Sequence, residues 1–137
     1  WADGLQLLRT PCPLPVAWDE TLQCALSRDE LARARDAGLR ALVLKPTSLG
    51  LPRCLELLGD AEALGLEAIA SHTLDGDFGL ALGLLLVALG TPHLAQGLGE
   101  GAGEWETLGS WERRGQTLVV DPNGPPGLGF ARSGGLP

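Results

Sequence analysis

The strongest constraint on the fold is an alternation of short apolar runs with helical patterns between residues 15 and 98. Strands that alternate with helices at this spacing predict a parallel sheet, because each helix carries the chain back to the same end of the sheet. Such crossovers are right-handed in almost all proteins. The predicted strands cover residues 15–20, 39–46, 66–72 and 92–98, and the predicted helices cover residues 27–38, 51–65 and 78–89.

Two of the predicted helices carry signals at their ends. Ser27 and Glu30 have the spacing of a capping box at the start of the helix 27–38. Gly65 stands where the helix 51–65 should stop, because glycine readily adopts the left-handed conformation that ends many helices. These signals support the assignment of helices between the apolar runs.

Four βα units predict an α/β fold that is half of a (β/α)₈-type barrel, since a complete barrel has about 250 residues and this chain has 137. The predicted half-barrel covers residues 1–103. The composition then becomes polar and glycine-rich, and residues 104–137 are predicted to form an irregular tail outside the barrel wall, with one short strand at TLVV. The chain starts inside a helical pattern without a methionine, so we expect a piece of a longer protein.

Composition argues against several classes of partner. The net charge is −7 and the basic residues are scattered, whereas binding to nucleic acid needs clustered Lys and Arg. The longest apolar run, residues 78–89, is too short to span a bilayer. Three cysteines without zinc-ligand spacing predict buried thiols in a chain of the reducing cytoplasm.

Several residues that can carry chemistry stand at the carboxyl ends of the predicted strands, the edge where parallel barrels gather their active sites. Most of them are polar or charged, although the strands that precede them are apolar. They are Asp19, Glu20, Lys45, Ser71, His72, Gln96 and Gly97.

Asp19 and Lys45 should lie on neighbouring strands at this edge, and two interpretations of the pair remain open. A carboxylate there can hold a hard cation such as Mg²⁺ through its oxygens. A lysine there can act as a general base if burial and a nearby cation lower its pKa. Alternatively, the two side chains form an ion pair that closes the barrel mouth.

Four motifs stand out in the barrel region: VAWDETL, LVLKPTSLG, AIASHTLDGDFGLALGLLLVAL and AQGLG. Together they resemble the o-succinylbenzoate synthase family, in the muconate-lactonizing branch of the enolase superfamily. The likeness covers roughly residues 10 to 99. A segment of the tail, DPNGPPGLGF, is similar to the closing segment of that family.

The resemblance implies a fold and a reaction. The family fold is a (β/α)₈ barrel with an α+β capping domain. Residues 1–103 would then be the C-terminal half of that barrel, and residues 104–137 would associate with the capping domain. The implied activity is that of a lyase: the dehydration of 2-succinyl-6-hydroxy-2,4-cyclohexadiene-1-carboxylate to o-succinylbenzoate in menaquinone synthesis. The family uses one Mg²⁺ held by three carboxylates, and two lysines on opposite faces of the substrate.

The resemblance also implies roles for individual residues. Asp19 matches the third metal carboxylate, and Lys45 matches the lysine that stabilises the enolate by a cation–π contact. Ser71 and Thr73 match the region that holds the succinyl carboxylate of the substrate. Gly97 matches a backbone contact on the last strand.

Glu20 follows the metal carboxylate directly. It is a candidate to support the metal from behind Asp19, and an ion pair at the rim is the favoured alternative.

Other parts of the family pattern have no counterpart in this sequence. The lysine of a K-x-K pair and the first two metal carboxylates are expected from a missing N-terminal half, in the same or a companion chain. N-acylamino acid racemase, or another racemase or cycloisomerase of the superfamily, is an alternative activity. A dipeptide epimerase is disfavoured, because the last strand AQGLG lacks an acid. A catalytically incomplete fragment or subunit is a further alternative.

Overall fold

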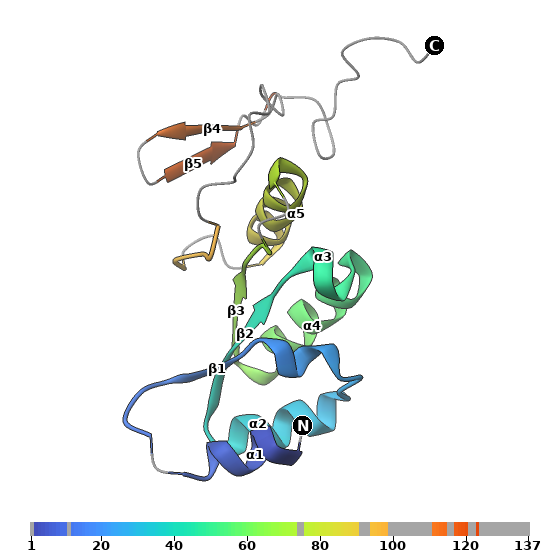
Figure 1. Ribbon diagram of the computed structural model, residues 1–137, viewed down its shortest axis with the longest axis vertical. Coiled ribbons are helices and arrows are strands. Elements are labelled where there is room, and N and C mark those ends of the chain that lie inside the picture. Colours follow the sequence, from blue (N-terminus) through green and yellow to red (C-terminus); the bar gives the residue numbers. More distant parts are fainter. Residues whose placement is uncertain are drawn as a thin grey trace.

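Three parallel strands form the larger of two described sheets, in the spatial order β1-β2-β3 (Figure 1). The computed structural model describes residues 2–10, 12–73, 76–90, 94–98, 111–114, 117–120 and 123. The strands are β1 (Val16–Trp18), β2 (Leu39–Leu44) and β3 (Glu67–Ala70). The predicted α/β fold with a parallel sheet is thus confirmed for three strands.

The fourth predicted strand is much reduced. Within the described part of residues 92–98, the structure has one parallel bridge, between Ser71 and Gly97. The amide of Gly97 donates a hydrogen bond to the carbonyl of Ala70 at 2.8 Å. The chain therefore does return beside β3, as predicted, but with a single bridge in place of a strand.

Helices connect the strands, and the predicted ones are present. An additional helix precedes β1, which agrees with the helical pattern at the start of the sequence. Two further short elements follow β1 and β2 and were not predicted: a 3₁₀ helix (Glu20–Gln23) and α3 (Pro46–Leu49). The longer helices are α1 (Ala2–Leu8), α2 (Arg28–Asp36), α4 (Leu51–Leu64) and α5 (Gly76–Leu89).

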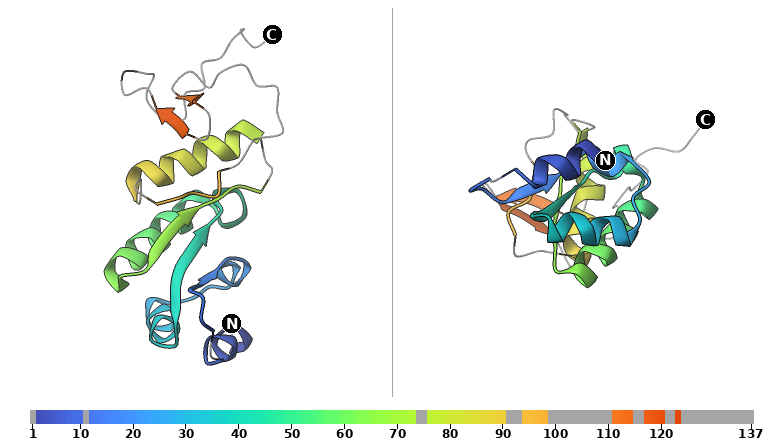
Figure 2. Two further views of the ribbon diagram at one scale, coloured as in Figure 1. Left: turned by 90° about the vertical axis from the view of Figure 1, so that its left-hand side faces the viewer. Right: turned by 90° about the horizontal axis from the view of Figure 1, so that it is seen from below.

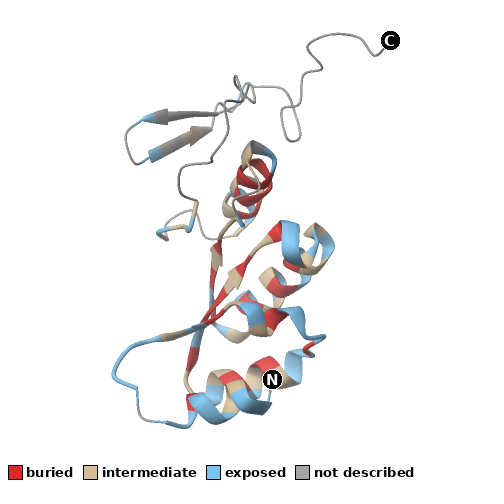
Figure 3. Cartoon of the chain, in the orientation of Figure 1, coloured by how far each residue is buried: buried red, intermediate tan, exposed pale blue. Residues whose placement is uncertain are grey.

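The main hydrophobic core lies between the sheet and the helices. Helices α2 and α4 run along the same side of the sheet (Figures 1 and 2). Burying such a layer of Leu and Ala side chains is the main favourable term in folding. Figure 3 shows buried residues along the strands and on the helices. The strand residues in this core include Trp18, Leu42, Leu44, Ala68 and Ala70, which pack with Leu31 and Leu57 of the helices.

The other face of the sheet is more open. Ala17 is exposed, and Val43 and Ile69 are only partly buried. Side chains of a strand alternate between its two faces, so these three residues lie opposite the helix-covered core. This face has a mainly apolar character without a covering helix among the described residues.

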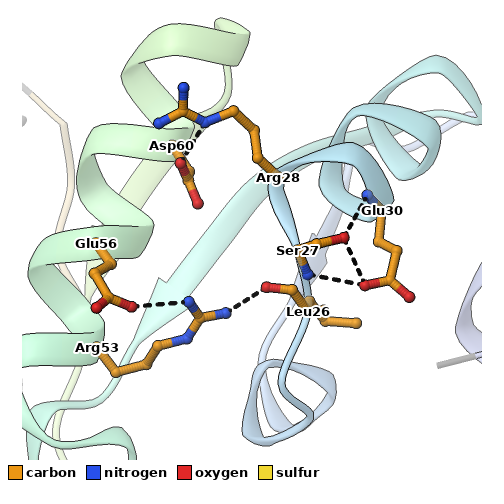
Figure 4. A network of polar contacts seen from close by, with 7 residues as sticks. All are labelled: Leu26, Ser27, Arg28, Glu30, Arg53, Glu56 and Asp60. Carbon is orange, nitrogen blue, oxygen red and sulfur yellow. Dashed lines mark hydrogen bonds and ion pairs between the residues drawn. The ribbon is translucent and has the colours of Figure 1, made fainter.

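Local hydrogen bonds fix the ends of the helices as the sequence predicts. The Ser27 hydroxyl accepts a bond from the amide of Glu30, and the Glu30 carboxylate accepts one from the amide of Ser27 at 2.8 Å (Figure 4). The Ser27 hydroxyl also donates to the Glu30 carboxylate at 2.8 Å, and the two bonds that this carboxylate accepts hold the pKa of Glu30 below its usual value. Gly65 ends α4 with φ of 67°, in the left-handed region. The capping box and the glycine stop are thus confirmed.

Two arginines connect successive units of the chain (Figure 4). Arg53 of α4 donates a hydrogen bond to the carbonyl of Leu26 at 2.7 Å, just before α2. Arg28 of α2 pairs with Asp60 of α4 at 2.6 Å. Polar contacts therefore join α4 both to α2 and to the segment just before it.

The described part of the C-terminal tail corrects the expectation of an irregular segment over 104–137. Strands β4 (Trp111–Arg114) and β5 (Thr117–Val120) form an antiparallel pair. The short strand at TLVV was anticipated, but its partner WERR was not. Charged residues made that stretch look like a loop, although cross-strand pairing tolerates charge on a solvent-facing side. Most other residues of the tail lie outside the described ranges.

The three cysteines differ in their exposure. Cys54 is buried, which raises its pKa to about 11, but Cys12 and Cys24 are exposed, so the expectation of buried thiols is wrong for two of three. Cys12 lies in the connection before β1, and Cys24 ends the 3₁₀ helix.

No helix among the described residues has the length and apolarity that crossing a bilayer requires.

Candidate functional site

The carboxyl edge of the sheet brings the predicted site residues together. Asp19 directly follows β1, Lys45 follows β2 and Ser71 follows β3. Because β2 and β3 are paired up to Leu44 and Ala70, the residues after them emerge side by side. The amide of Ser71 donates to the carbonyl of Leu44 at 2.9 Å, which extends this contact past the strand ends.

These residues occupy equivalent positions in successive βα units. The contacts Asp19–Lys45 and Ser71–Gly97 each join residues that are 26 apart in sequence, and Lys45 and Ser71 are separated by the same step. A threonine follows two positions after the first three of these residues: Thr21, Thr47 and Thr73. The sequence analysis did not detect this period of 26 residues, although comparing the chain with itself would have revealed it.

Lys45 and Asp19 form an ion pair at the rim. The Nζ of Lys45 lies 2.5 Å from Oδ2 of Asp19 and 3.5 Å from Oε1 of Glu20. The Lys45 side chain is 19% exposed, whereas that of Glu20 is 78% exposed. Of the two interpretations that the sequence left open, the ion pair is therefore present in this structure.

The charge state of Lys45 follows from this pair. The hydrogen bond to Asp19 raises the pKa of Lys45 above its ordinary value of 10.5, more than burial lowers it. The lysine is thus an ammonium ion at neutral pH. An ammonium in this place suits the stabilisation of negative charge. Lys45 is also the only lysine in the sequence.

Among the described residues, Asp19 is the candidate to hold a metal ion. Carboxylate oxygens such as those of Asp19 are the ligands that Mg²⁺ prefers. However, no group of three His, Cys, Asp or Glu side chains in the described ranges could hold a metal ion. Asp19 therefore fits as a single ligand. Glu20 lies toward Lys45 at the rim, in agreement with the ion-pair interpretation of this residue.

Ser71 and Gly97 are in direct contact. The Ser71 hydroxyl donates a hydrogen bond to the carbonyl of Gly97 at 3.3 Å. A Cβ atom at position 97 would lie 2.9 Å from Oγ of Ser71 and 3.1 Å from its Cβ, too close for ordinary packing. Gly97 thus permits the chain to approach Ser71 closely. Next to it, the side-chain oxygen of Gln96 accepts a bond from the amide of Ala70 at 2.8 Å.

Thr73 lies beyond Ser71 on the loop after β3, and it contacts a residue that the sequence analysis missed. Its hydroxyl lies 2.9 Å from the hydroxyl of Thr47 in α3. Both threonines are exposed. The repeated position of a threonine two residues after Lys45 and Ser71 is the signal that could have identified Thr47.

Comparison with known proteins confirms the resemblance drawn from the motifs. The chain is 38% identical over 95 residues to the o-succinylbenzoate synthase of Proteus mirabilis, 31% over 108 residues to that of Pasteurella multocida, and 28% over 122 residues to that of Haemophilus influenzae. These alignments cover 58%, 69% and 78% of this chain. They cover 28%, 32% and 36% of the relatives, so the chain spans about a third of their length. No protein-family model matches the chain.

Proposed function

We propose that this chain forms the C-terminal part of the active site of an o-succinylbenzoate synthase-like lyase. The reaction is the Mg²⁺-dependent dehydration of 2-succinyl-6-hydroxy-2,4-cyclohexadiene-1-carboxylate to o-succinylbenzoate, in menaquinone synthesis. The observation that carries the proposal is the similarity to synthases over 58% to 78% of the chain. The cluster of Asp19, Lys45 and Ser71 at one sheet edge supports it.

The proposal includes the architecture of the complete protein. Residues 1–103 form the C-terminal half of an enolase-type (β/α) barrel, and residues 104–137 associate with its capping domain. Two observations support the barrel. β1 lies at an edge of the described sheet, and an edge strand offers unpaired backbone groups to a neighbour. The face with Ala17, Val43 and Ile69 is open and mainly apolar, as expected of a sheet face that lines the interior of a barrel.

In this mechanism Lys45 acts through its charge. Dehydration removes the proton next to the ring carboxylate and the hydroxyl group on the neighbouring carbon, and the two leave as water. Negative charge develops on the carboxylate as the proton departs. The ordinary pKa of a lysine is far above neutral, so Lys45 is an ammonium ion whose charge stabilises this negative charge where it forms.

Asp19 is one of three carboxylates that hold the metal. When bound, Mg²⁺ adds positive charge beside the substrate carboxylate. Ser71 and Thr73 hold the succinyl carboxylate through their hydroxyls and the backbone amides of the following loop, and Gly97 provides a backbone contact on the last strand. Since the Ser71 hydroxyl can rotate away from the Gly97 carbonyl, its 3.3 Å bond is one that a carboxylate, a stronger acceptor, would displace.

The remaining groups come from an N-terminal half, in the same chain or in a companion chain. We expect it to contribute a K-x-K lysine as the base and two further metal carboxylates. The cytoplasm is the expected location, because three unpaired cysteines suit a reducing compartment.

The test is complementation. The chain is assayed with Mg²⁺ and the cyclohexadiene carboxylate by ultraviolet absorbance, alone and with the preceding N-terminal half added or fused. We expect turnover in the complemented sample and none in the chain alone. Absence of turnover in the complemented sample would contradict the proposal. Racemisation of N-acylamino acids by that sample, without dehydration, would favour the racemase alternative.

A further inference from the structure

Thr47 occupies a place at the rim from which it can act on Lys45. It lies in α3, two residues after Lys45. The amides of Ser48 and Leu49 donate hydrogen bonds to the carbonyl of Lys45 at 3.1 and 3.0 Å. The turn that contains Thr47 is therefore built on the Lys45 carbonyl, and a force on Thr47 is transmitted to the backbone of Lys45.

The hydroxyl of Thr47 reaches the loop that follows the neighbouring strand. It lies 2.9 Å from the hydroxyl of Thr73, two residues after Ser71. The backbone bond from Ser71 to Leu44 joins the same two strand ends at 2.9 Å. The threonine pair is thus a second connection, placed farther out, between the loop of Lys45 and the loop of Ser71.

This pair completes a series of contacts around the rim. Asp19–Lys45, Thr47–Thr73 and Ser71–Gly97 each join residues 26 apart. Each contact therefore links one βα unit to the next at the same step. Of these three contacts, the threonine pair is the one that joins the βα unit of Lys45 to the βα unit of Ser71.

We propose that Thr47 is a positioning residue: it fixes the loop of Ser71 and Thr73 relative to the ammonium of Lys45. This inference rests on the proposed function, in which one loop holds the succinyl carboxylate and Lys45 faces the ring. Dehydration requires both ends of the substrate to be held in register, and misplacement of a binding group weakens catalysis from a distance.

The experiment compares Thr47→Val, Thr47→Ser and Ser48→Ala in the complete enzyme. Valine keeps the shape of threonine without the hydroxyl, and serine restores the hydroxyl. Ser48 is exposed in the same turn and serves as the matched control. For Thr47→Val we expect KM for the cyclohexadiene carboxylate to rise about fivefold to tenfold, the effect of one lost hydrogen bond, with a smaller change in kcat. Thr47→Ser and Ser48→Ala should remain near the wild type.

A double-mutant cycle with Thr73→Val tests whether the two hydroxyls act together. If they do, the effect of the double variant on KM is smaller than the sum of the two single effects, because each single variant already breaks the bond between the two hydroxyls. Fully additive effects on KM, or a Thr47→Ser variant as impaired as Thr47→Val, would overturn the inference.

Amide hydrogen exchange at His72 and Thr73, followed by NMR, separates this inference from the proposed function. It needs no turnover. Exchange at these amides should be faster in Thr47→Val than in Thr47→Ser or Ser48→Ala. Unchanged exchange would refute the positioning role even in an active enzyme, whereas faster exchange in an enzyme that does not dehydrate the substrate would refute the assigned reaction alone.

Discussion

At the scale of residues, the pair of Asp19 and Lys45 shows what sequence reasoning can reach. Two polar residues at the ends of neighbouring parallel strands had to emerge at one edge, so their proximity was predictable. The direction in which the pKa of Lys45 shifts was not predictable. It depends on whether the 2.5 Å contact with Asp19, which raises the pKa, outweighs burial, which lowers it. Such a balance follows from side-chain geometry, which strand order does not fix.

Replacing Asp19 by Asn should therefore lower the pKa of Lys45. Lys45 is the only lysine, so a chain labelled with ¹³C-lysine gives one side-chain signal whose titration, without divalent metal, reports this pKa. Glu20→Gln is the control and should have a smaller effect, because Glu20 is 3.5 Å away and 78% exposed. Equal shifts in both variants would show that Asp19 is not the principal partner.

The same pKa predicts how stability depends on pH. A pKa that is higher in the folded state than its ordinary 10.5 stabilises the fold as long as Lys45 is protonated. That contribution is complete below pH 10.5 and is lost as the pH rises through the folded-state pKa. Urea denaturation across this range should show a smaller alkaline loss of unfolding free energy in Asp19→Asn than in the wild type.

Gly97→Ala should destabilise the protein, because its Cβ would lie 2.9 Å from Oγ of Ser71. Overpacking of this kind costs about 1–3 kcal/mol. Gly59→Ala is the matched control: no atom lies within 4 Å of the added Cβ, and alanine in the interior of α4 should stabilise by up to about 1 kcal/mol. Denaturant midpoints measure both changes. A neutral Gly97→Ala would mean that residue 97 does not pack against Ser71.

At the scale of elements, the long helices were predictable and the short ones were not. The helix α2 has a capping box, and α4 ends at a left-handed glycine, so local signals marked their bounds. The turn α3 has four residues, too few to show a helical period, and it forms because Pro46 can begin a helix directly after a strand. The run 92–98 was predicted as a strand from its composition, but a strand also depends on its neighbours.

Ser27→Ala tests the capping box as a property of α2. The hydroxyl accepts a bond from the amide of Glu30 (Figure 4), and loss of such a cap costs about 1 kcal/mol. Ser27→Thr keeps the hydroxyl and should cost less. Thermal or denaturant unfolding distinguishes the two variants, and equal losses in both would indicate that the cap does not stabilise the helix.

At the scale of the whole molecule, the repeat of 26 residues explains why the site is an edge rather than a pocket within one unit. Each βα unit contributes one residue to the rim: Asp19, Lys45, Ser71 and then Gly97. The repeat was missed in the sequence because little besides the following threonine is shared between units. The paired strand β4 was missed for a different reason, since its charged residues do not alternate with apolar ones.

The open face of the sheet and the short length of the chain have one explanation in the proposed architecture. The chain spans about a third of its relatives, and the face with Val43 and Ile69 remains partly exposed. The proposed N-terminal half would cover this face and bring the base to the opposite side of the substrate from Lys45. In this proposal the ammonium of Lys45 is the main contribution of this chain to the reaction.

The most direct measurement is the rate of dehydration by Lys45→Ala in the complemented enzyme, beside Arg40→Ala. Arg40 is a cation near the other end of the same strand and is exposed, so its loss should leave the rate near that of the wild type. Loss of the Lys45 ammonium should lower kcat by about 10²–10³-fold, the usual effect of removing one charge-stabilising group. A Lys45→Ala enzyme that dehydrates the substrate at the wild-type rate would contradict the role of this rim in the reaction.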